Sequence, residues 1–365
     1  MFNNKGPQPL VVNPVFFDLS GVRLDLPAMK IPAKSFQEVD LRDLLANFLP
    51  QYKEGSLQVS HQGGRLQLGA QFKILKQGMI FDEQFIQPAT RFPSNRLESV
   101  WWKPSNQTDT KFILSNTTNN AVTTTVEVEG TAPHQQQPAT IFLNPHETRV
   151  LDILQNLVGQ QNGGTVKKEG GISITHNGAA GAIMARILIS DEGDGYSSVV
   201  NFTDPTTPLS SKLNGGGLRI GAIGTDELEP IVVERNIGTT TTTVSGQVPY
   251  TDANGNVAFV AIPATEINAG KSKTINLRQE IEAANIPANV KFAGINLEYS
   301  TAPGSVVMNA LSVSQSGEQV FQVPLLDPQR LPSSAGGFPW KVDGDYTTVI
   351  FIKNESNAPK NTLQT

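Results

Sequence analysis

The amino-acid sequence predicts an all-β protein of three tandem antiparallel β-sandwich repeats, each with one short crossover helix. Three observations support this prediction: similar segments recur with a period of about 120 residues, apolar and polar residues alternate within them, and several runs are rich in Thr and Val. Alternation at period two is typical of half-buried strands, and β-branched residues favour a pleated sheet. The recurrence itself indicates a repeat architecture.

The recurring segments stand in the same order in each copy. A strand-like segment ends at Asn116, Asn236 and Asn354, so these asparagines are 120 and 118 residues apart. The two segment types that follow each begin at corresponding places, the first at Ile31, Leu143 and Ile267 and the second at Ser56, Gly171 and Gly294. We therefore predict repeats at residues 1–100, 101–218 and 219–338, with 339–365 as an extra terminal strand or the start of a further repeat.

The predicted strands are recognised by their apolar faces. Ile183, Ala185 and Ile187 fall on one face of a strand, and the corresponding positions of the other copies are also apolar. The Thr- and Val-rich runs that begin at Ala121 and Thr239 add further strands. We expect about seven strands per repeat, which is the count of an antiparallel sandwich.

A helical signal follows the second segment of each copy. The three candidates are LRDLLANFL from Leu41, LQNLVGQQ from Leu154 and LRQEIEAAN from Leu277. We expect one short crossover helix in each repeat.

By its period, strand count and threonine-rich strands, the chain resembles the tandem immunoglobulin-like repeats of bacterial secreted and surface proteins. That resemblance implies a non-enzymatic structural or adhesive role, as a spacer, stalk or surface-interaction module with a protein or polysaccharide partner. It also implies an extracellular or cell-surface location.

Composition excludes several classes of function. The formal net charge is −5, so no basic excess is present to bind nucleic acid. The chain has no Cys, which rules out disulfides, thiolate nucleophiles and cysteine metal sites. No apolar run reaches membrane-spanning length, so we expect no membrane insertion.

The four histidines show no catalytic or metal-binding spacing. His61 and His176 correspond to Tyr299 of the third copy, which favours a structural position at a strand end. His146 corresponds to Lys34 and Gly270, in a turn. No nucleophile motif occurs either, and we predict that the protein is not an enzyme.

A calcium site is one interpretation of the loop TDANGN. Asp252, Asn254 and Asn256 place oxygen ligands at alternate positions, which is the pattern that a hard cation needs. The other interpretation is a hairpin turn without metal, because Asn-Gly between two apolar runs is a hairpin signal. We favour the turn, and expect no cofactor. The acidic turn of Asp191, Glu192 and Asp194 allows the same two interpretations.

Trp101, Trp102 and Trp340 are the only tryptophans, and they too allow two interpretations. Exposed rings would make the protein a carbohydrate-binding module, because a sugar stacks on an indole face. Alternatively, Trp102 and Trp340, which correspond across two copies, cover the junctions between successive sandwiches. We favour the junction.

The segment from Trp340 to Asn354 aligns without a gap with Trp102 to Asn116, and the first copy begins after this strand. In one interpretation the strand closes the third sandwich, or the chain is part of a longer array. In the other, it inserts into the first sandwich of a neighbouring molecule and forms head-to-tail polymers by strand addition.

Overall fold

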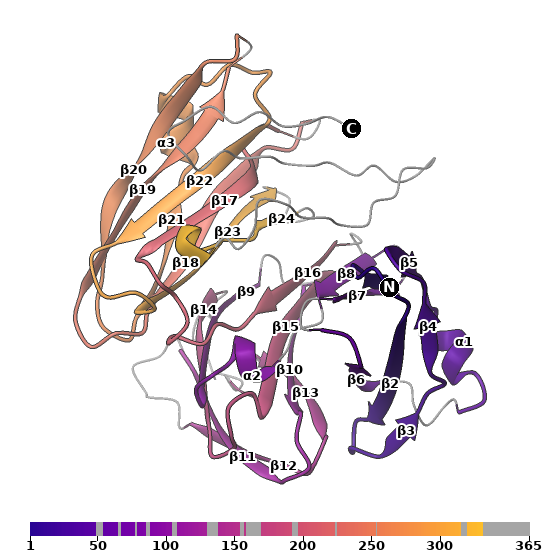
Figure 1. The fold of residues 1–365 in the computed structure, drawn as a ribbon. Coiled ribbons are helices and arrows are strands. Elements are labelled where there is room, and N and C mark those ends of the chain that lie inside the picture. Colours follow the sequence, from indigo (N-terminus) through magenta and orange to yellow (C-terminus); the bar gives the residue numbers. More distant parts are fainter. Residues whose placement is uncertain are drawn as a thin grey trace. The chain divides into compact units, whose positions relative to one another are not determined.

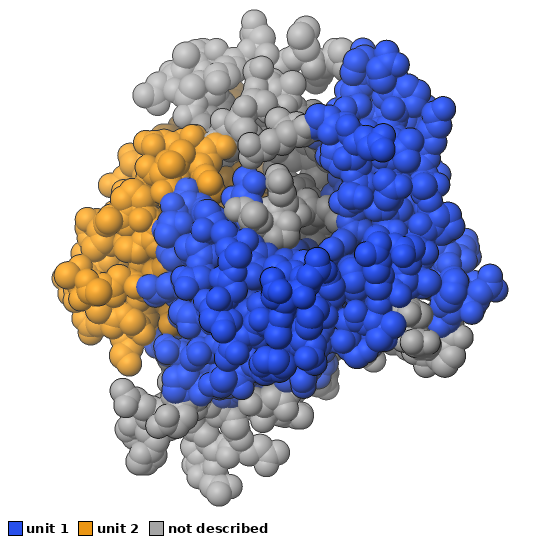
Figure 2. All heavy atoms as spheres, turned by 60° about the horizontal axis from the view of Figure 1, so that its bottom comes forward, with its two compact units in different colours: residues 1–207 blue, residues 208–365 orange. Residues whose placement is uncertain are grey.

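The computed structural model describes residues 1–48, 54–64, 67–76, 79–84, 88–103, 108–129, 138–153, 157, 169–191, 196–222, 225–252, 254–314 and 320–330. These residues form antiparallel strands with a few short helices, so the predicted all-β class is confirmed (Figure 1). The chain divides into two compact units, residues 1–207 and 208–365 (Figure 2). The strand from Trp340 to Asn354, and with it the polymer interpretation, lies outside the described residues.

Two four-stranded sheets form the first sheet pair. Their orders are β5-β1-β7-β8 and β3-β2-β4, with β6 pairing to β2. The strands are β1 (Phe2–Asn4), β2 (Leu10–Asp18), β3 (Arg23–Asp25), β4 (Met29–Ile31), β5 (Ser35–Gln37), β6 (Gly55–His61), β7 (Leu68–Lys76) and β8 (Met79–Gln84).

The second sheet pair has the orders β13-β10-β15-β16 and β12-β11-β14-β9. It therefore contains eight described strands, one more than we expected. They are β9 (Arg96–Trp102), β10 (Asp109–Asn116), β11 (Val122–Val128), β12 (Ala139–Leu143), β13 (Thr148–Asp152), β14 (Glu169–His176), β15 (Ile183–Asp191) and β16 (Tyr196–Asn201). The predicted face of Ile183, Ala185 and Ile187 is buried.

The third sheet pair, in the second unit, has the orders β21-β18-β23-β24 and β17-β22-β19-β20. Strand by strand, this is the same order as in the second pair. The strands are β17 (Lys212–Arg219), β18 (Leu228–Asn236), β19 (Thr242–Thr251), β20 (Val257–Ile267), β21 (Ser272–Asn276), β22 (Phe292–Tyr299), β23 (Val306–Ser314) and β24 (Val320–Val323).

Paired sheets share a core where alternate residues of each strand point inward. In the third pair, one apolar cluster joins Val232 and Ala310 of one sheet to Val244 and Ile295 of the other. In the first pair, Phe2 of β1 packs with Val12 of β2 in the same way. Burial of these side chains is the main stabilising contribution to a sandwich.

Short helices follow β5 and β21. The helix α1 (Leu41–Leu45) begins after Asp40, whose carboxylate accepts the Arg42 N–H at 2.8 Å, and α3 (Arg278–Ala283) follows the buried Leu277. Both lie where a helix was predicted. The helix predicted from Leu154 falls almost wholly outside the described residues. A third helix, α2 (Pro88–Arg91), and a 3₁₀ helix, Pro328–Arg330, were not predicted.

The strand-end asparagines Asn116 and Asn236 share a structural role with Asn4, which stands at the corresponding position of the first sheet pair. Each is buried at a strand end, and its amide nitrogen lies 2.7 Å from the carbonyl oxygen of the residue four positions later. The same nitrogen also donates at 2.9 Å to a second backbone carbonyl oxygen, which belongs to Pro32, Asn144 and Ile267 respectively. The side-chain oxygen accepts the N–H two residues later. The side chain therefore ties two chain segments together in all three sheet pairs.

Strand pairing places the divisions between sheet pairs earlier than we predicted. The divisions after residues 100 and 218 fall inside β9 and β17, yet β9 pairs with β14 and β17 with β22, in the sheet pairs that follow. Asp204 accepts the Ser94 N–H at 2.6 Å, and Asp327 accepts the Ser210 N–H at 3.0 Å. Each aspartate thus ties the end of a sheet pair to the residues before its first strand.

Candidate functional site

The two tryptophans on β9 are buried, contrary to the sugar-stacking interpretation. Trp101 is 0% exposed and Trp102 is 2% exposed, so neither ring offers a face to a ligand in solvent. Neighbouring strand residues point to opposite faces of a sheet, so β9 is covered on both sides. Trp340 lies outside the described residues.

The loop from Asp252 to Asn256 forms a hydrogen-bonded hairpin turn. The Asp252 carboxylate accepts the backbone N–H groups of Asn254 and Asn256, at 2.9 and 2.8 Å, and the Asn256 side-chain amide at 3.1 Å. These bonds lower the pKa of Asp252, and both of its carboxylate oxygens accept hydrogen bonds within the turn. Glu192 and Asp194 lie outside the described residues, as does the side chain of Asp191.

His61, His176 and Tyr299 lie at corresponding strand ends, as predicted. They are the last residues of β6, β14 and β22. The Tyr299 hydroxyl accepts the Gly304 N–H at 2.8 Å, and burial lowers the pKa of His176. Through this bond, Tyr299 supports the turn that follows β22.

The turn that contains His146 packs against the first sheet pair, and this contact is the candidate site. His146 has φ +58°, and its counterparts Lys34 and Gly270 have φ +49° and +71°, so all three occupy the left-handed region. Only His146 carries a ring there. Its imidazole stacks on the ring of Phe17 from β2, with 4.0 Å between centroids and 11° between planes.

Hydrogen bonds at both ring nitrogens define the state of His146. Its Nδ1 lies 3.2 Å from the Gln58 amide nitrogen, and its Nε2 lies 2.7 Å from the Asn119 side-chain oxygen. An amide nitrogen only donates and an amide oxygen only accepts. The imidazole is therefore neutral, with its proton on Nε2.

Backbone groups meet directly beside this ring. The Thr148 N–H donates to the Leu19 carbonyl oxygen at 3.0 Å. Gly21 has φ +88°, and a Cβ there would overlap the Pro145 carbonyl oxygen. Only glycine permits this approach, because it lacks Cβ and adopts positive φ without strain.

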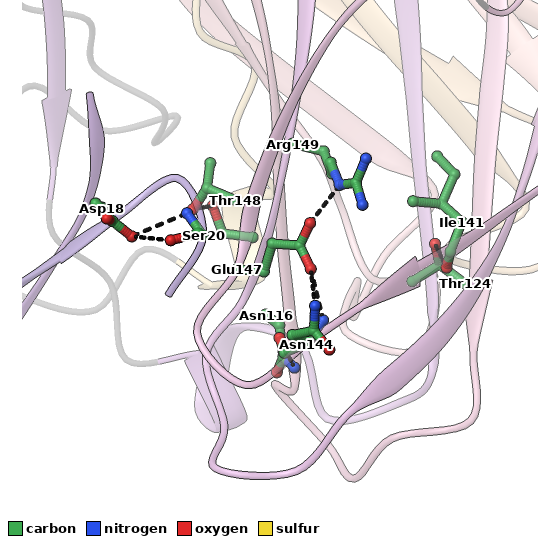
Figure 3. A network of polar contacts seen from close by, with 10 residues as sticks. Asp18, Ser20, Asn116, Thr124, Ile141, Asn144, Glu147, Thr148 and Arg149 are labelled. Atoms are coloured by element: carbon green, nitrogen blue, oxygen red, sulfur yellow. Dashed lines mark hydrogen bonds and ion pairs between the residues drawn. The ribbon is translucent and has the colours of Figure 1, made fainter. Parts of the chain in front are cut away.

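Polar side chains hold the two facing turns in shape (Figure 3). On the first sheet pair, the Asp18 carboxylate accepts the Ser20 hydroxyl at 2.8 Å and the Val22 N–H at 2.8 Å. On the second, Glu147 binds the Asn144 backbone and side chain and pairs with Arg149. We call the contact of residues 17–21 and Gln58 with Thr117, Asn119 and residues 145–148 the joint.

A shallow cleft of about 420 Å³ lies over the joint. Most of its polar lining is already paired: His146 binds Gln58 and Asn119, Gln58 also binds Thr117, and Arg23 is paired with Asp25 at 2.6 Å. Within the described part of the chain, no cluster of three or more His, Asp or Glu side chains could hold a metal ion. The arrangement is suited to holding two sheet pairs together.

Neither a protein-family model nor a curated protein matches the sequence. No helix of the described residues is long and apolar enough to cross a membrane.

The sequence places His146 in a turn but does not indicate Phe17, Gly21 or Gln58 as its neighbours. The available signal was the difference between copies, because His146 replaces Lys34 and Gly270 at one turn position. The partners come from strands more than 80 residues away in sequence, as the 88-residue separation from Gln58 illustrates.

Proposed function

We propose that this protein is a non-enzymatic structural or adhesive repeat protein, built from three tandem immunoglobulin-like β-sandwich repeats and acting outside the cell or at its surface. The matching strand orders of the second and third sheet pairs support the repeat. That order differs from the A-B-E-D and C-F-G order of an immunoglobulin constant domain, so the likeness rests on the sandwich architecture.

The joint is the observation that carries the proposed role. A spacer or stalk must keep its modules in a defined orientation, and linkers rich in Gly and Ser cannot do so. Here backbone groups of two modules are in direct contact, at Gly21 and between Thr148 and Leu19, and the His146 and Phe17 rings stack beside them. Such a contact restrains both rotation and bending.

The test is the relative motion of the first two sheet pairs in the full chain. Residual dipolar couplings at pH 8 should fit one alignment tensor for amides of both pairs. Gly21→Ala should require two tensors, because the new Cβ separates the turns. Gly64→Ala is the control, because a Cβ at that position meets nothing within 4 Å. Two tensors for the unmodified protein would overturn the proposed spacer role.

A further inference from the structure

The joint contains one histidine, His146, whose two ring nitrogens both form hydrogen bonds with side-chain amides. We propose that the joint is a pH-sensitive device, in which protonation of His146 releases the first sheet pair from the second. This inference rests on the proposed function, because it assigns regulation to the joint. It depends on the hydrogen-bond donors around the imidazole.

Protonation of His146 breaks its hydrogen bond with Gln58, because two donors then face each other. In the neutral ring, Nδ1 accepts from the Gln58 amide nitrogen at 3.2 Å. In the imidazolium both ring nitrogens carry hydrogen, so Nδ1 no longer accepts. The bond from Nε2 to Asn119 survives, and the loss is confined to the side that faces β6.

Gln58 cannot relieve this conflict by rotating its amide. Its nitrogen also donates to the Thr117 carbonyl oxygen at 3.1 Å. Turning the amide oxygen toward His146 would place that oxygen against the Thr117 carbonyl, where two acceptors would face each other. The Thr117 carbonyl therefore fixes the orientation of the Gln58 amide. In that orientation the amide nitrogen faces Nδ1 and favours the neutral imidazole over the imidazolium.

The surrounding charges act in the same direction. Burial lowers the pKa of His146 from its ordinary value of 6.5, and the positive charge of Arg23 on β3 lowers it further. The nearest carboxylates are engaged elsewhere: Asp25 with Arg23, Asp18 with Ser20 and Val22, and Glu147 with Asn144 and Arg149. The turn from Thr117 to Asn120 and residue 58 of β6 contribute no charge.

The sign of the pH effect follows from this direction. A histidine whose pKa is lower in the closed joint than in the open one favours closure while it is neutral. The contribution of His146 to closure of the joint is therefore fully present at high pH and weakens as the pH falls below 6.5. One titrating proton changes the closing equilibrium by at most about tenfold per pH unit.

The test is hydrogen exchange of the Thr148 amide, whose acceptor Leu19 lies across the joint. Its protection factor in the full chain should fall more than about threefold between pH 8 and pH 5, within the limit of one titrating proton. His146→Gly should abolish the pH dependence, and Gly270 shows that the turn accepts glycine. The control His176→Tyr, which copies Tyr299, should retain it. A pH-independent factor, or one that varies equally in His146→Gly, would overturn the proposal.

Gln58→Glu provides a second test with an independent readout. A carboxylate beside Nδ1 stabilises the imidazolium, so the pKa of His146, measured by NMR of its ring proton, should rise. The pH dependence of the Thr148 protection factor should then reverse or vanish. An unchanged pKa would contradict the proposed contact. The single alignment tensor at pH 8 tests the joint itself, so failure of the switch is distinguishable from failure of the spacer role.

Discussion

Glu234 is a buried carboxylic acid on β18 of the third sheet pair. Its side chain is 0% exposed on β18, and both carboxylate oxygens are without a hydrogen-bond partner among the described residues. The corresponding positions in the other copies are the buried Leu114 and Phe2. Burial raises the pKa of Glu234 to about 8, and Lys273, across from it on β21, opposes the rise. The carboxyl group is therefore mainly neutral at pH 7.

We expect the second unit to be most stable in mild acid because of this group. The unfolded carboxyl titrates near 4.5 and the folded one near 8, so the unfolded state binds fewer protons between these values. The free energy of unfolding should fall as the pH rises from 4.5 to 8, by up to about 1.4 kcal/mol per pH unit. This free energy is measured at each pH by unfolding in urea, with hydrogen exchange of the β18 and β23 amides as the probe.

Glu234→Leu should remove that dependence and stabilise the second unit at pH 7 by about 1–3 kcal/mol, because an unsatisfied buried polar group is lost. Glu229→Leu, on the same strand and partly exposed, is the control and should change little. A pH profile for Glu234→Leu that parallels the unmodified protein would refute this role.

The buried asparagines lead to a second residue-scale prediction. Asn236→Ala leaves the carbonyls of Thr240 and Ile267 and the Gly238 N–H without their partner. We expect the second unit to lose about 2–4 kcal/mol of unfolding free energy, as measured in urea, because unmade buried bonds are costly. Asn254→Ala is the matched control, because Asn254 bonds through its backbone in an exposed turn. Equal losses in the two variants would contradict the assignment.

At the scale of elements, the pairing of β19 with β22 depends on one glycine. Gly246 stands at an irregularity in the ladder of β19 with β20, and on the side of β22 a Cβ there would overlap the Asn296 carbonyl oxygen. Gly246→Ala should destabilise the second unit by about 1–3 kcal/mol, because backbone cannot move aside as a flexible side chain can. Faster exchange of β19 and β22 amides checks it, with Gly64→Ala as the tolerated control. Unchanged exchange rates would count against this close approach.

The aspartates that close the second and third sheet pairs predict sensitivity to strong acid. Against the opposing effect of burial, hydrogen bonds from Thr206 and Ser94 lower the pKa of Asp204, and those from Ser210, Leu209 and Gln329 lower the pKa of Asp327. A depressed carboxyl pKa contributes stability that is present above 3.8 and is lost as the pH falls through the folded pKa. Exchange of the Ser94 and Leu209 amides, corrected for intrinsic rates, should accelerate below pH 4. In Asp204→Ala, Ser94 alone should lose its protection at neutral pH, while Leu209 keeps it.

At the scale of the whole molecule, a good part of the architecture could be predicted because it has local causes. Alternating apolar residues, such as Ile183, Ala185 and Ile187, form a buried strand face wherever the strand is placed. The positive φ of Lys34, His146 and Gly270 matches their alignment as one turn position. The asparagine ends of the strands recur because the same hydrogen bonds recur, although the sequence alone did not reveal those bonds.

The remaining features depend on contacts between residues that are distant in sequence. The sequence left a sugar-stacking interpretation of Trp101 and Trp102 open beside the favoured junction, but pairing of β9 with β14 and coverage of both its faces buries them. The divisions between sheet pairs lie earlier than the sequence predicted, because β9 and β17 could be assigned to a sheet pair only once their partner strands were known. His146 gained a role because Phe17 and Gln58 of another sheet pair meet its ring. The amino-acid sequence by itself determined the strands and their period, through side-chain alternation and turn chemistry. Only the tertiary structure decided which side chains are buried, paired or left without a partner, because burial depends on what packs against each face.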